Sequence, residues 1–319
     1  MSDKIEEIIP SVDRKLLKKE LTKEKLARTT RKGENEIYIV NYHNSPNVLR
    51  EIGRLRELSF RSAGGGTKKS IDLDDYDTTE KCYDQLIVWS PEDEEIIGGY
   101  RFIDCAKIID EDSKNIPMST SHYFNFSDRF IKDFLPHTIE LGRSWVQPMY
   151  QPSVNPRKGL YALDNLWDGL AVLTVVYPNL KYFFGKVTMY PNYDAKCRDF
   201  LLYFLKHYFP DSENLATSKY PLKHDPEEET YKEMLNGLDF KEGFKILNQY
   251  IRSRDHNVPP LINIYMHLSP TMRTFGTAMN PEFGGVEETG IMVTIADIYE
   301  DKKERHITPL LNNEKTFKK

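Results

Sequence analysis

The chain has 319 residues, of which 39% are hydrophobic and 29% charged, and a formal net charge of −5. A mean hydropathy of −0.59, with no apolar run near the ~18 residues of a membrane span, excludes an integral membrane protein. The start MSDKIEEIIP lacks the apolar core of a secretory signal, and three cysteines (Cys82, Cys105, Cys197) have neither disulfide parity nor metal-ligand spacing. We therefore expect a reduced cytoplasmic protein without a bound metal, large enough for one elaborate domain or for two.

The first 33 residues have a different charge balance from the rest. They hold ten Lys and Arg against six Asp and Glu, so the remainder carries a net charge of −9. The stretch DRKLLKKELTKEKLARTTRK predicts a basic helical arm, residues 1–33, which is either a solvated surface helix or a contact for anionic lipid or an acidic protein. Nucleic acid is not expected as a partner, because the acidic remainder would repel phosphates.

The first predicted elements after the arm are a strand and a helix. EIYIVNY (36–42) alternates and predicts a strand, and the pair Ser45-Pro46 predicts the start of a helix that runs to about Phe60. Its inward stripe is expected to be Val48, Leu49, Ile52, Leu55 and Ser59. Off that stripe lie Arg50, Glu51, Arg54 and Glu57.

A mixed order of strands and helices follows. QLIVWS and EIIGGYRFIDC flank PEDE and predict a hairpin; HTIELGRSWV and KYFFGKVTM predict strands; YALDNLWDGLAVLTVVY and YDAKCRDFLLYFLKHYF predict helices. Residues 211–256 are charged and helical, and two late strands are expected around LINIYMHL and TGIMVTIA. This order predicts a mixed α/β sheet flanked by helices, with a helical insertion before the last strands.

The run SFRSAGGGTKKS resembles a phosphate-binding loop at first sight. A nucleotide P-loop ends in Gly-Lys-Ser/Thr, which is missing here, and no G-x-G-x-x-G follows a strand. A glycine-rich connection between two elements is therefore favoured over a phosphate cradle.

Several charged residues lie where apolar strands are expected. Arg101 lies within GGYRF, and Glu140 and Arg143 lie within ELGRSWV. Buried charges are costly unless they are paired, so these side chains should meet opposite charges or line a polar cleft. By strict alternation Glu140 and Arg143 point to opposite faces, so a direct pair between them requires a bulge, and Arg101 or Arg56 is the expected partner of Glu140.

Taken together, these residues resemble a known family. R-x-x-x-F (Arg56, Phe60), D-x-x-D (Asp74, Asp77), G-x-x-R-F (Arg101) and E-x-x-R (Glu140, Arg143) are similar to the motifs of the acyl-homoserine-lactone synthases and of the ornithine-acyl-carrier-protein N-acyltransferases. ELGRSWVQPMYQ, LDNLWDGLA, YFFGKVTMYPNY, PPLINIYMHL and NPEFG extend the resemblance to the latter family, over roughly residues 36–306.

The resemblance implies the GCN5-related N-acetyltransferase (GNAT) fold over residues 34–310, with the insertion at about 211–256 and a disordered tail at 311–319. The activity it implies moves a fatty acyl group, often 3-hydroxylated, from acyl carrier protein to the α-amine of glycine or ornithine in amino-acid lipid synthesis. The catalytic residues carried over are Glu140, Arg143, Arg101, Asp74 and Asp77. The substrate-binding candidates are Arg56, Phe60, Val146, Arg157, Lys158 and Gly159.

Glu140 is the candidate general base, since an amine must lose a proton to attack a thioester. The helix entrance with Arg157, Lys158 and the Gly159 amide is the expected site for the pantetheine phosphate, with acyl carrier protein favoured over coenzyme A as donor. The glycine run falls where the related lactone synthases have a mobile segment over the acceptor site, which implies a lid or hinge.

Two alternatives to this activity are open. The lactone synthases have a tryptophan six residues after the phenylalanine, where this chain has Gly66, and this departure disfavours an S-adenosylmethionine acceptor. A non-enzymatic, haemolysin-like lipid-binding protein is the second alternative, based on the basic arm and the aromatic run FLLYFLKHYF. Peripheral contact with the inner membrane face is compatible with either activity.

Overall fold

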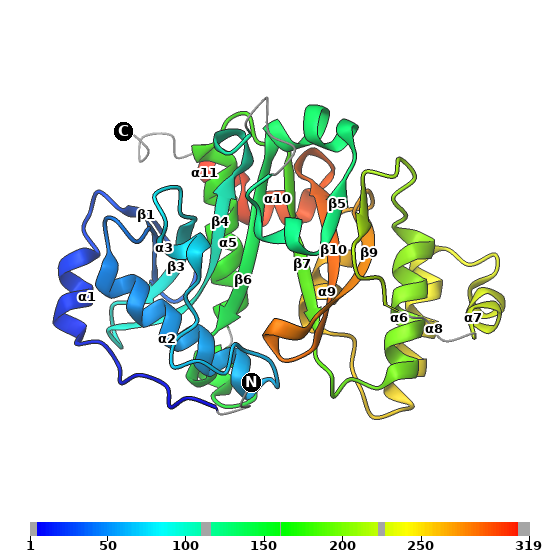
Figure 1. Ribbon diagram of the computed structural model, residues 1–319, viewed down its shortest axis with the longest axis horizontal. Helices are drawn as coiled ribbons and strands as arrows, with labels where there is room; N and C mark the ends of the chain where they lie inside the picture. Colours follow the sequence, from blue (N-terminus) through cyan, green and yellow to red (C-terminus); the bar gives the residue numbers. More distant parts are fainter. Residues whose placement is uncertain (1–4, 110–115, 160, 223–226, 312–319) are drawn as a thin grey trace. The chain divides into compact units, whose positions relative to one another are not determined.

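The computed structural model describes residues 5–109, 116–159, 161–222 and 227–311, and they form two compact units (Figure 1). Unit 1 comprises the described parts of Met1–Ile108, Ile139–Leu180 and Glu300–Lys319. Unit 2 comprises those of Ile109–Thr138 and Lys181–Tyr299. All the site residues predicted from the sequence lie in unit 1.

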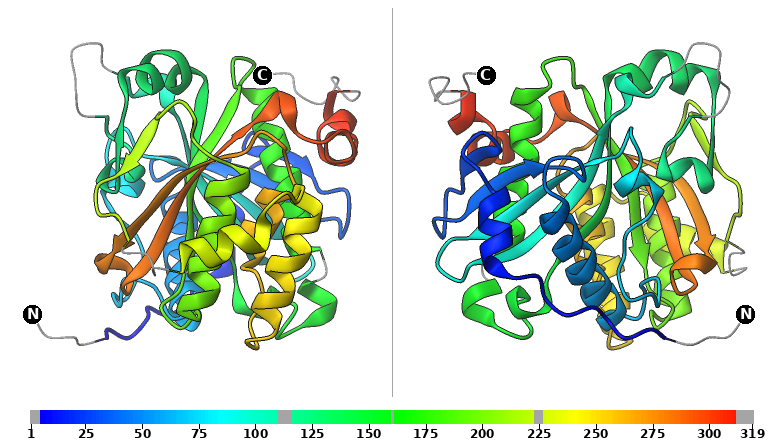
Figure 2. Two further views of the ribbon diagram at one scale, coloured as in Figure 1. Left: turned by 90° about the vertical axis from the view of Figure 1, so that its right-hand side faces the viewer. Right: turned by 60° about the vertical axis from the view of Figure 1, so that its left-hand side comes forward.

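Unit 1 is built on antiparallel strands that pair in the order β1 (Leu26–Thr29), β2 (Glu36–Val40), β3 (Asp84–Ser90), β4 (Glu95–Asp104) and β6 (Thr138–Val146). Its helices are α1 (Arg14–Glu20), α2 (Pro46–Ser62), α3 (Asp75–Thr78), α4 (Pro156–Gly159), α5 (Ala162–Val176), α10 (Glu300–His306) and α11 (Thr308–Leu311). The right panel of Figure 2 brings α1 and α2 forward.

The two faces of the unit 1 sheet differ in polarity. Leu86 of β3 faces α5 so closely that a Cβ built at Gly169 would lie 2.4 Å from Leu86 Cδ2. The preceding residue, Gln85, points to the opposite face and donates a hydrogen bond to Asp77 of α3. Helices α2 and α3 therefore cover a face that carries charged and polar side chains, and α5 covers an apolar face.

A bulge interrupts the pairing of β4 with β6. Gly99 lies opposite Trp145, but Arg101 lies opposite Gly142, so β6 has one extra residue at Arg143 and Ser144. Arg143 adopts φ 46°, a left-handed conformation that costs any residue with a side chain about 1 kcal/mol or more. The bulge re-aims the Arg143 side chain away from the alternation expected for a regular strand.

Unit 2 contains the antiparallel strands β7 (Tyr182–Met189), β10 (Val286–Thr294) and β9 (Arg273–Asn280), which pair in that order, and the separate pair β5 (Phe124–Phe126) and β8 (Ala216–Ser218). Its helices are α6 (Ala195–Tyr208), α7 (Glu228–Leu235), α8 (Phe240–Arg252) and α9 (Pro260–Met266). The left panel of Figure 2 brings α6, α7 and α8 to the front.

The strands and helices predicted between residues 36 and 208 are confirmed, and so are the helices of the insertion and the last strand, β10. The strand expected around LINIYMHL is wrong: this segment is α9, and β10 pairs instead with β9, which follows α9, and with β7. A short, mostly apolar segment does not distinguish a strand from a helix, and Pro260 in the first helical turn favours the helix. Of the tail predicted at residues 311–319, Leu311 is the last residue of α11, and residues 312–319 lie outside the described residues.

The basic arm is also less helical than expected. Among its described residues, 5–33, the helical segment is Arg14–Glu20, and Leu26–Thr29 pairs with β2 as the outer strand of unit 1. Arg14 Nη2 lies 2.6 Å from Glu95 Oε1 and Lys18 Nζ lies 2.5 Å from Glu94 Oε1, both at the β3–β4 turn. Part of the basic charge of this segment is thus matched within unit 1, with Leu17 buried beneath it.

Candidate active site

Arg56 lies at the centre of a buried cluster of charges between α2 and the sheet of unit 1. Its side chain is fully buried, and Nη1 and Nη2 donate to the two carboxylate oxygens of Asp77 at 3.0 and 3.1 Å. Nε donates to Asp72 Oδ2 at 3.0 Å. A bidentate guanidinium–carboxylate pair fixes both side chains in one plane.

Arg101 of β4 adds a second buried guanidinium to this cluster. Its Nη1 lies 2.7 Å from Asp74 Oδ1, 2.8 Å from Asp74 Oδ2 and 3.3 Å from Asp77 Oδ2. The guanidinium carbon also lies 5.2 Å from the centre of the Tyr83 ring and 5.5 Å from that of Tyr76. Arg101 is therefore held by carboxylates and by two aromatic faces.

The bulge brings Arg143 to the same carboxylates. Arg143 Nε lies 3.0 Å from Asp72 Oδ2, and Nη2 lies 3.6 Å from Asp74 Oδ2. Three arginines and three aspartates thus form one network, which we call the Arg/Asp cluster: Arg56, Arg101, Arg143, Asp72, Asp74 and Asp77. The expectation that Arg101 and Arg143 meet opposite charges is confirmed.

The charges of the cluster hold one another ionised. Burial acts to raise the pKa of Asp77, but the charges of Arg56 and Arg101 outweigh it and hold the pKa below the ordinary value. Burial likewise acts to raise the pKa of Asp72, and Arg143 and Arg56 hold it low. Opposite charges within about 3 Å in a medium of low dielectric explain why the ionised forms prevail.

Glu140, the candidate base, lies on the same face of the sheet. It is 2% exposed and sits opposite Ile103 in the β4–β6 pairing, two pairs away from Arg101 and Gly142. Its Oε2 accepts a hydrogen bond from Tyr83 Oη. The arginine partner expected for Glu140 stays a prediction, whereas its contact with a tyrosine was not anticipated.

The glycine run is held by a buried carboxylate. Glu57, which was expected to lie off the inward stripe of its helix, is fully buried, and its Oε2 accepts from the amide (2.9 Å) and hydroxyl (2.8 Å) of Thr67. The amides of Gly64 and Gly65 donate to carbonyls at the end of α2. Amides used in this way are not a phosphate cradle, and the role of lid or hinge stays a prediction.

The remaining substrate-binding candidates lie in two places. Phe60 is buried in the last turn of α2, and Val146 is half-buried at the end of β6, opposite Gly98. A Cβ at Gly98 would lie 2.4 Å from Trp145 O, so only glycine allows β4 to approach β6 this closely. Both residues stay candidates from the resemblance.

The expected phosphate site at α4 is partly occupied by the protein itself. The Gly159 amide donates to Asn155 O at 2.8 Å, and a Cβ at Gly159 would lie 2.5 Å from Pro152 N. Lys158 Nζ lies 2.6 Å from Asp93 Oδ1, and Arg157 is exposed. Gly159 thus has a packing role here, and Arg157 and Lys158 are both exposed, Lys158 with Asp93 as its partner.

The sequence alone did not identify Asp72, Gln85, Tyr76 or Tyr83 as parts of this site. Asp72 had a signal, because I-D-L-D-D-Y-D places it two residues before Asp74. Gln85 had a weaker one, as the polar first residue of an apolar strand. Tyr76 and Tyr83 had no signal in the sequence. Their role depends on the turn from α3 into β3, where the Tyr83 amide donates to Tyr76 O at 2.7 Å.

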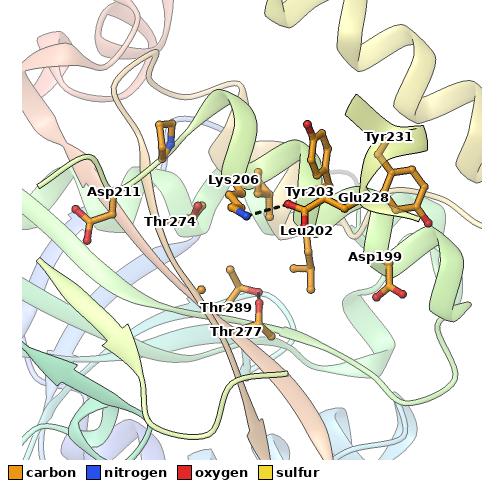
Figure 3. A pocket seen from close by; sticks show the side chains of 13 residues that line it. Asp199, Leu202, Tyr203, Lys206, Asp211, Glu228, Tyr231, Thr274, Thr277 and Thr289 are labelled. Atoms are coloured by element: carbon orange, nitrogen blue, oxygen red, sulfur yellow. Dashed lines mark hydrogen bonds and ion pairs between the residues drawn. The ribbon is translucent and has the colours of Figure 1, made fainter. Parts of the chain in front are cut away.

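Unit 2 contains a cavity of its own, about 290 Å³ in volume, between α6, α7, β9 and β10 (Figure 3). Its wall is largely apolar, and at one side the hydroxyls of Thr277 and Thr289 lie 2.8 Å apart. Lys206 and Glu228 pair at 2.9 Å, and both are exposed. None of the site residues predicted from the sequence lines this cavity.

Comparison with known proteins defines the class. Residues 55–157, which span the Arg/Asp cluster and Glu140, match the model of the acetyltransferase (GNAT) domain family. The mixed α/β fold and this domain identify an acyltransferase, so the predicted fold class and enzyme class are confirmed, and the non-enzymatic alternative is wrong.

Two curated relatives identify the family. The glycine N(alpha)-acyltransferase of Bacteroides thetaiotaomicron is 55% identical over 309 residues, which is 97% of this chain and 92% of that protein. That of Phocaeicola vulgatus is 54% identical over 308 residues, 95% of this chain and 93% of that protein. The chain belongs to the glycine N(alpha)-acyltransferase family.

Two further findings complete the comparison. A crystal structure of the AHL synthase LasI matches 48% of this chain and 72% of that one, with a TM-score of 0.25 and 15% identity, and at this score the match carries no argument. Within the described ranges, every helix is too short or too polar to cross a membrane.

The Arg/Asp cluster makes a testable contribution to stability. Because Asp77 and Asp72 have lowered pKa values in the folded protein, their contribution is fully present above the ordinary value of 3.8 and is lost as pH falls toward the folded values. Asp77→Asn should lower the free energy of unfolding at pH 7 by about 3–5 kcal/mol, because it leaves buried guanidinium groups without their partner.

Denaturant titrations from pH 7 to pH 3 measure both effects. Below about pH 5 the wild-type free energy of unfolding should fall more steeply than that of Asp77→Asn. Asp75→Asn, on the same helix but exposed, is the matched control and should follow the wild type. Equal pH slopes for wild type and Asp77→Asn would contradict the assignment of a lowered Asp77 pKa.

Proposed function

We propose that the protein transfers a fatty acyl group from acyl carrier protein to the α-amine of glycine. The identity of 54–55% to two proteins named glycine N(alpha)-acyltransferase, over nearly the whole chain, carries this proposal. The resemblance noted in the sequence supports a fatty, often 3-hydroxylated, acyl group and a role in amino-acid lipid synthesis. Glycine is thus favoured over ornithine as acceptor.

The reaction needs one proton acceptor and one aligned amine. The glycine ammonium gives a proton to a carboxylate, the free amine attacks the thioester carbonyl, a C–N bond forms and the C–S bond breaks. The second amine proton leaves with the thiolate as the pantetheine thiol. Glu140 is the proposed proton acceptor, because it is a buried carboxylate on the polar face of the sheet that the GNAT domain match covers.

The Arg/Asp cluster supplies rigidity next to this base. Its pairs fix α2, the segment from Asp72 to Asp77, β4 and the bulge of β6 with respect to one another. Two of its buried polar atoms, Arg101 Nε and Asp72 Oδ1, have no hydrogen-bond partner within the described ranges. Because buried polar atoms are rarely left unsatisfied, these two atoms support the binding of a further polar group or water at the cluster.

The donor is proposed to be acyl carrier protein, a small acidic protein whose prosthetic arm carries the thioester. Arg157 is exposed on α4, and Lys158 beside it forms an ion pair with Asp93. Positive charge at the docking surface would steer an acidic carrier and make association sensitive to salt. The alternative donor is a coenzyme A thioester. Measuring the rate of acyl transfer with each donor in turn distinguishes the two.

The acceptor assignment predicts the outcome of a thiol-release assay. Purified protein with acyl carrier protein thioester should release thiol when glycine is added, and little with ornithine, serine or no acceptor. S-adenosylmethionine is included as the acceptor of the alternative, lactone-synthase activity. Release with S-adenosylmethionine alone, or with ornithine in preference to glycine, would overturn the proposed acceptor.

The base assignment predicts the effect of Glu140→Gln. Glutamine keeps the shape and can still accept from Tyr83, but it cannot take a proton, so kcat should fall by ~10²-fold or more. The melting temperature should change little, because glutamine keeps the size of the side chain and its hydrogen bond to Tyr83. If Glu140 instead serves only the fold, the melting temperature falls and kcat of the folded protein stays near that of the wild type.

The docking surface is tested by charge reversal. Arg157→Glu with Lys158→Glu should raise the KM for the acyl carrier protein substrate about tenfold at low salt, with less effect at high salt. The matched control is Arg252→Glu with Lys241→Glu, the same charge change at exposed positions of α8. A KM that rises equally in both double variants, or in neither, would remove α4 from the docking surface.

A further inference from the structure

Tyr83 lies between the candidate base, Glu140, and the Arg/Asp cluster. It precedes β3, is 2% exposed, and its hydroxyl donates to Glu140 Oε2. Its ring stacks on Tyr76, with centroids 5.4 Å apart and planes at 28°, and lies under the Arg101 guanidinium. A single side chain thus contacts the candidate base and a member of the Arg/Asp cluster.

The pairing of the strands explains why Tyr83 can reach Glu140. Gln85, Arg101 and Gly142 lie in one row across β3, β4 and β6. Tyr83 stands two residues before Gln85, and Glu140 two residues before Gly142, so both point to the face of that row. Ile103 lies between them, and a phenol is long enough to span the intervening strand.

We propose that Tyr83 is a positioning residue that fixes the Glu140 carboxylate for proton transfer from the acceptor amine. This inference rests on the proposed function, in which Glu140 is the base. A hydrogen bond from Tyr83 to one carboxylate oxygen holds the Glu140 side chain in one rotamer and so fixes the direction of the carboxylate. It also favours the ionised carboxylate, which is the form that accepts a proton.

Three titratable groups near Glu140 (Tyr76, Cys105 and Arg101) have pKa values that are raised in the folded protein. Burial raises the pKa of Tyr76 to about 12, with a further contribution from the charge of Glu140. Burial, followed by the charge of Glu140, raises the pKa of the Cys105 thiol well above its ordinary value. Arg101 stays charged, because Asp77 and Asp74 outweigh the effect of its burial and raise its pKa.

Tyr83→Phe tests the proposal, because it removes the hydroxyl and keeps the ring on Tyr76 and Arg101. We expect kcat to fall about tenfold with KM for glycine nearly unchanged, as a misaligned base slows the proton transfer more than it weakens binding. The acid limb of the kcat profile should move to higher pH, since the ionised carboxylate loses a donor. The matched control is Tyr38→Phe, which removes a buried tyrosine's bond to Glu36 on β2.

A double-mutant cycle separates this inference from the base assignment. With Glu140→Gln present, Tyr83→Phe should have little further effect on kcat, because the group it positions no longer takes a proton. A wild-type kcat in Glu140→Gln would overturn the base assignment itself. A large loss in Glu140→Gln with wild-type kcat and acid limb in Tyr83→Phe would overturn the role of Tyr83 alone.

A second variant covers the case in which Tyr83→Phe does not fold. 3-Fluorotyrosine at position 83 keeps the size and the hydrogen bond, but its phenol is a stronger donor. The acid limb should then move to lower pH, opposite to the shift in Tyr83→Phe. An acid limb that coincides with that of the wild type would overturn the proposal.

Discussion

The buried Arg/Asp cluster is the constraint on which unit 1 depends. Three guanidinium groups and three carboxylates come from α2, the segment 72–77, β4 and the bulge of β6. Their net charge is balanced, so burial leaves no excess charge, yet removing any one partner would leave another uncompensated. An apolar core of the same shape could be at least as stable. The cost of so many buried charges is therefore an argument for function, since pairing of this kind fixes side chains with an accuracy that packing alone does not give.

The bulge shows how the backbone serves the cluster. Strict alternation would turn Arg143 away from the face of Glu140, and an extra residue in β6 with φ 46° at Arg143 turns it back toward Asp72 and Asp74. A glycine would adopt this conformation without strain. Arginine at this position accepts about 1 kcal/mol or more of strain. The charge pairs hold the strained residue in place, and strain of this kind is typical of positions that serve a site.

Much of the fold follows from local pattern. The alternation of EIYIV, the two apolar runs on either side of PEDE and the Ser-Pro start of α2 were sufficient to predict β2, β3, β4 and α2. The helix at Pro260–Met266 was predicted as a strand, because a short, mostly apolar segment fits the period of a helix as well as that of a strand. The short strand Leu26–Thr29 was missed too, since its pairing with β2 is a tertiary contact that the charged sequence around it hides.

The candidate site was predictable to the extent that its motifs are linear. Arg56, Asp74, Asp77, Arg101 and Arg143 were named from spacing and resemblance, and the structure unites them. Tyr83 could not be predicted from the sequence. Its contact with Glu140 depends on two features that are fixed only in three dimensions: the turn from α3 to β3 and the register of β4 with β6. The same reasoning explains why linear motifs contain the charged residues but omit the tyrosine. An arginine in an apolar strand is conspicuous in the sequence, because burying its charge is costly. A tyrosine fits such a segment whether or not it has a function, and only the position of its hydroxyl distinguishes a functional tyrosine from one that merely packs.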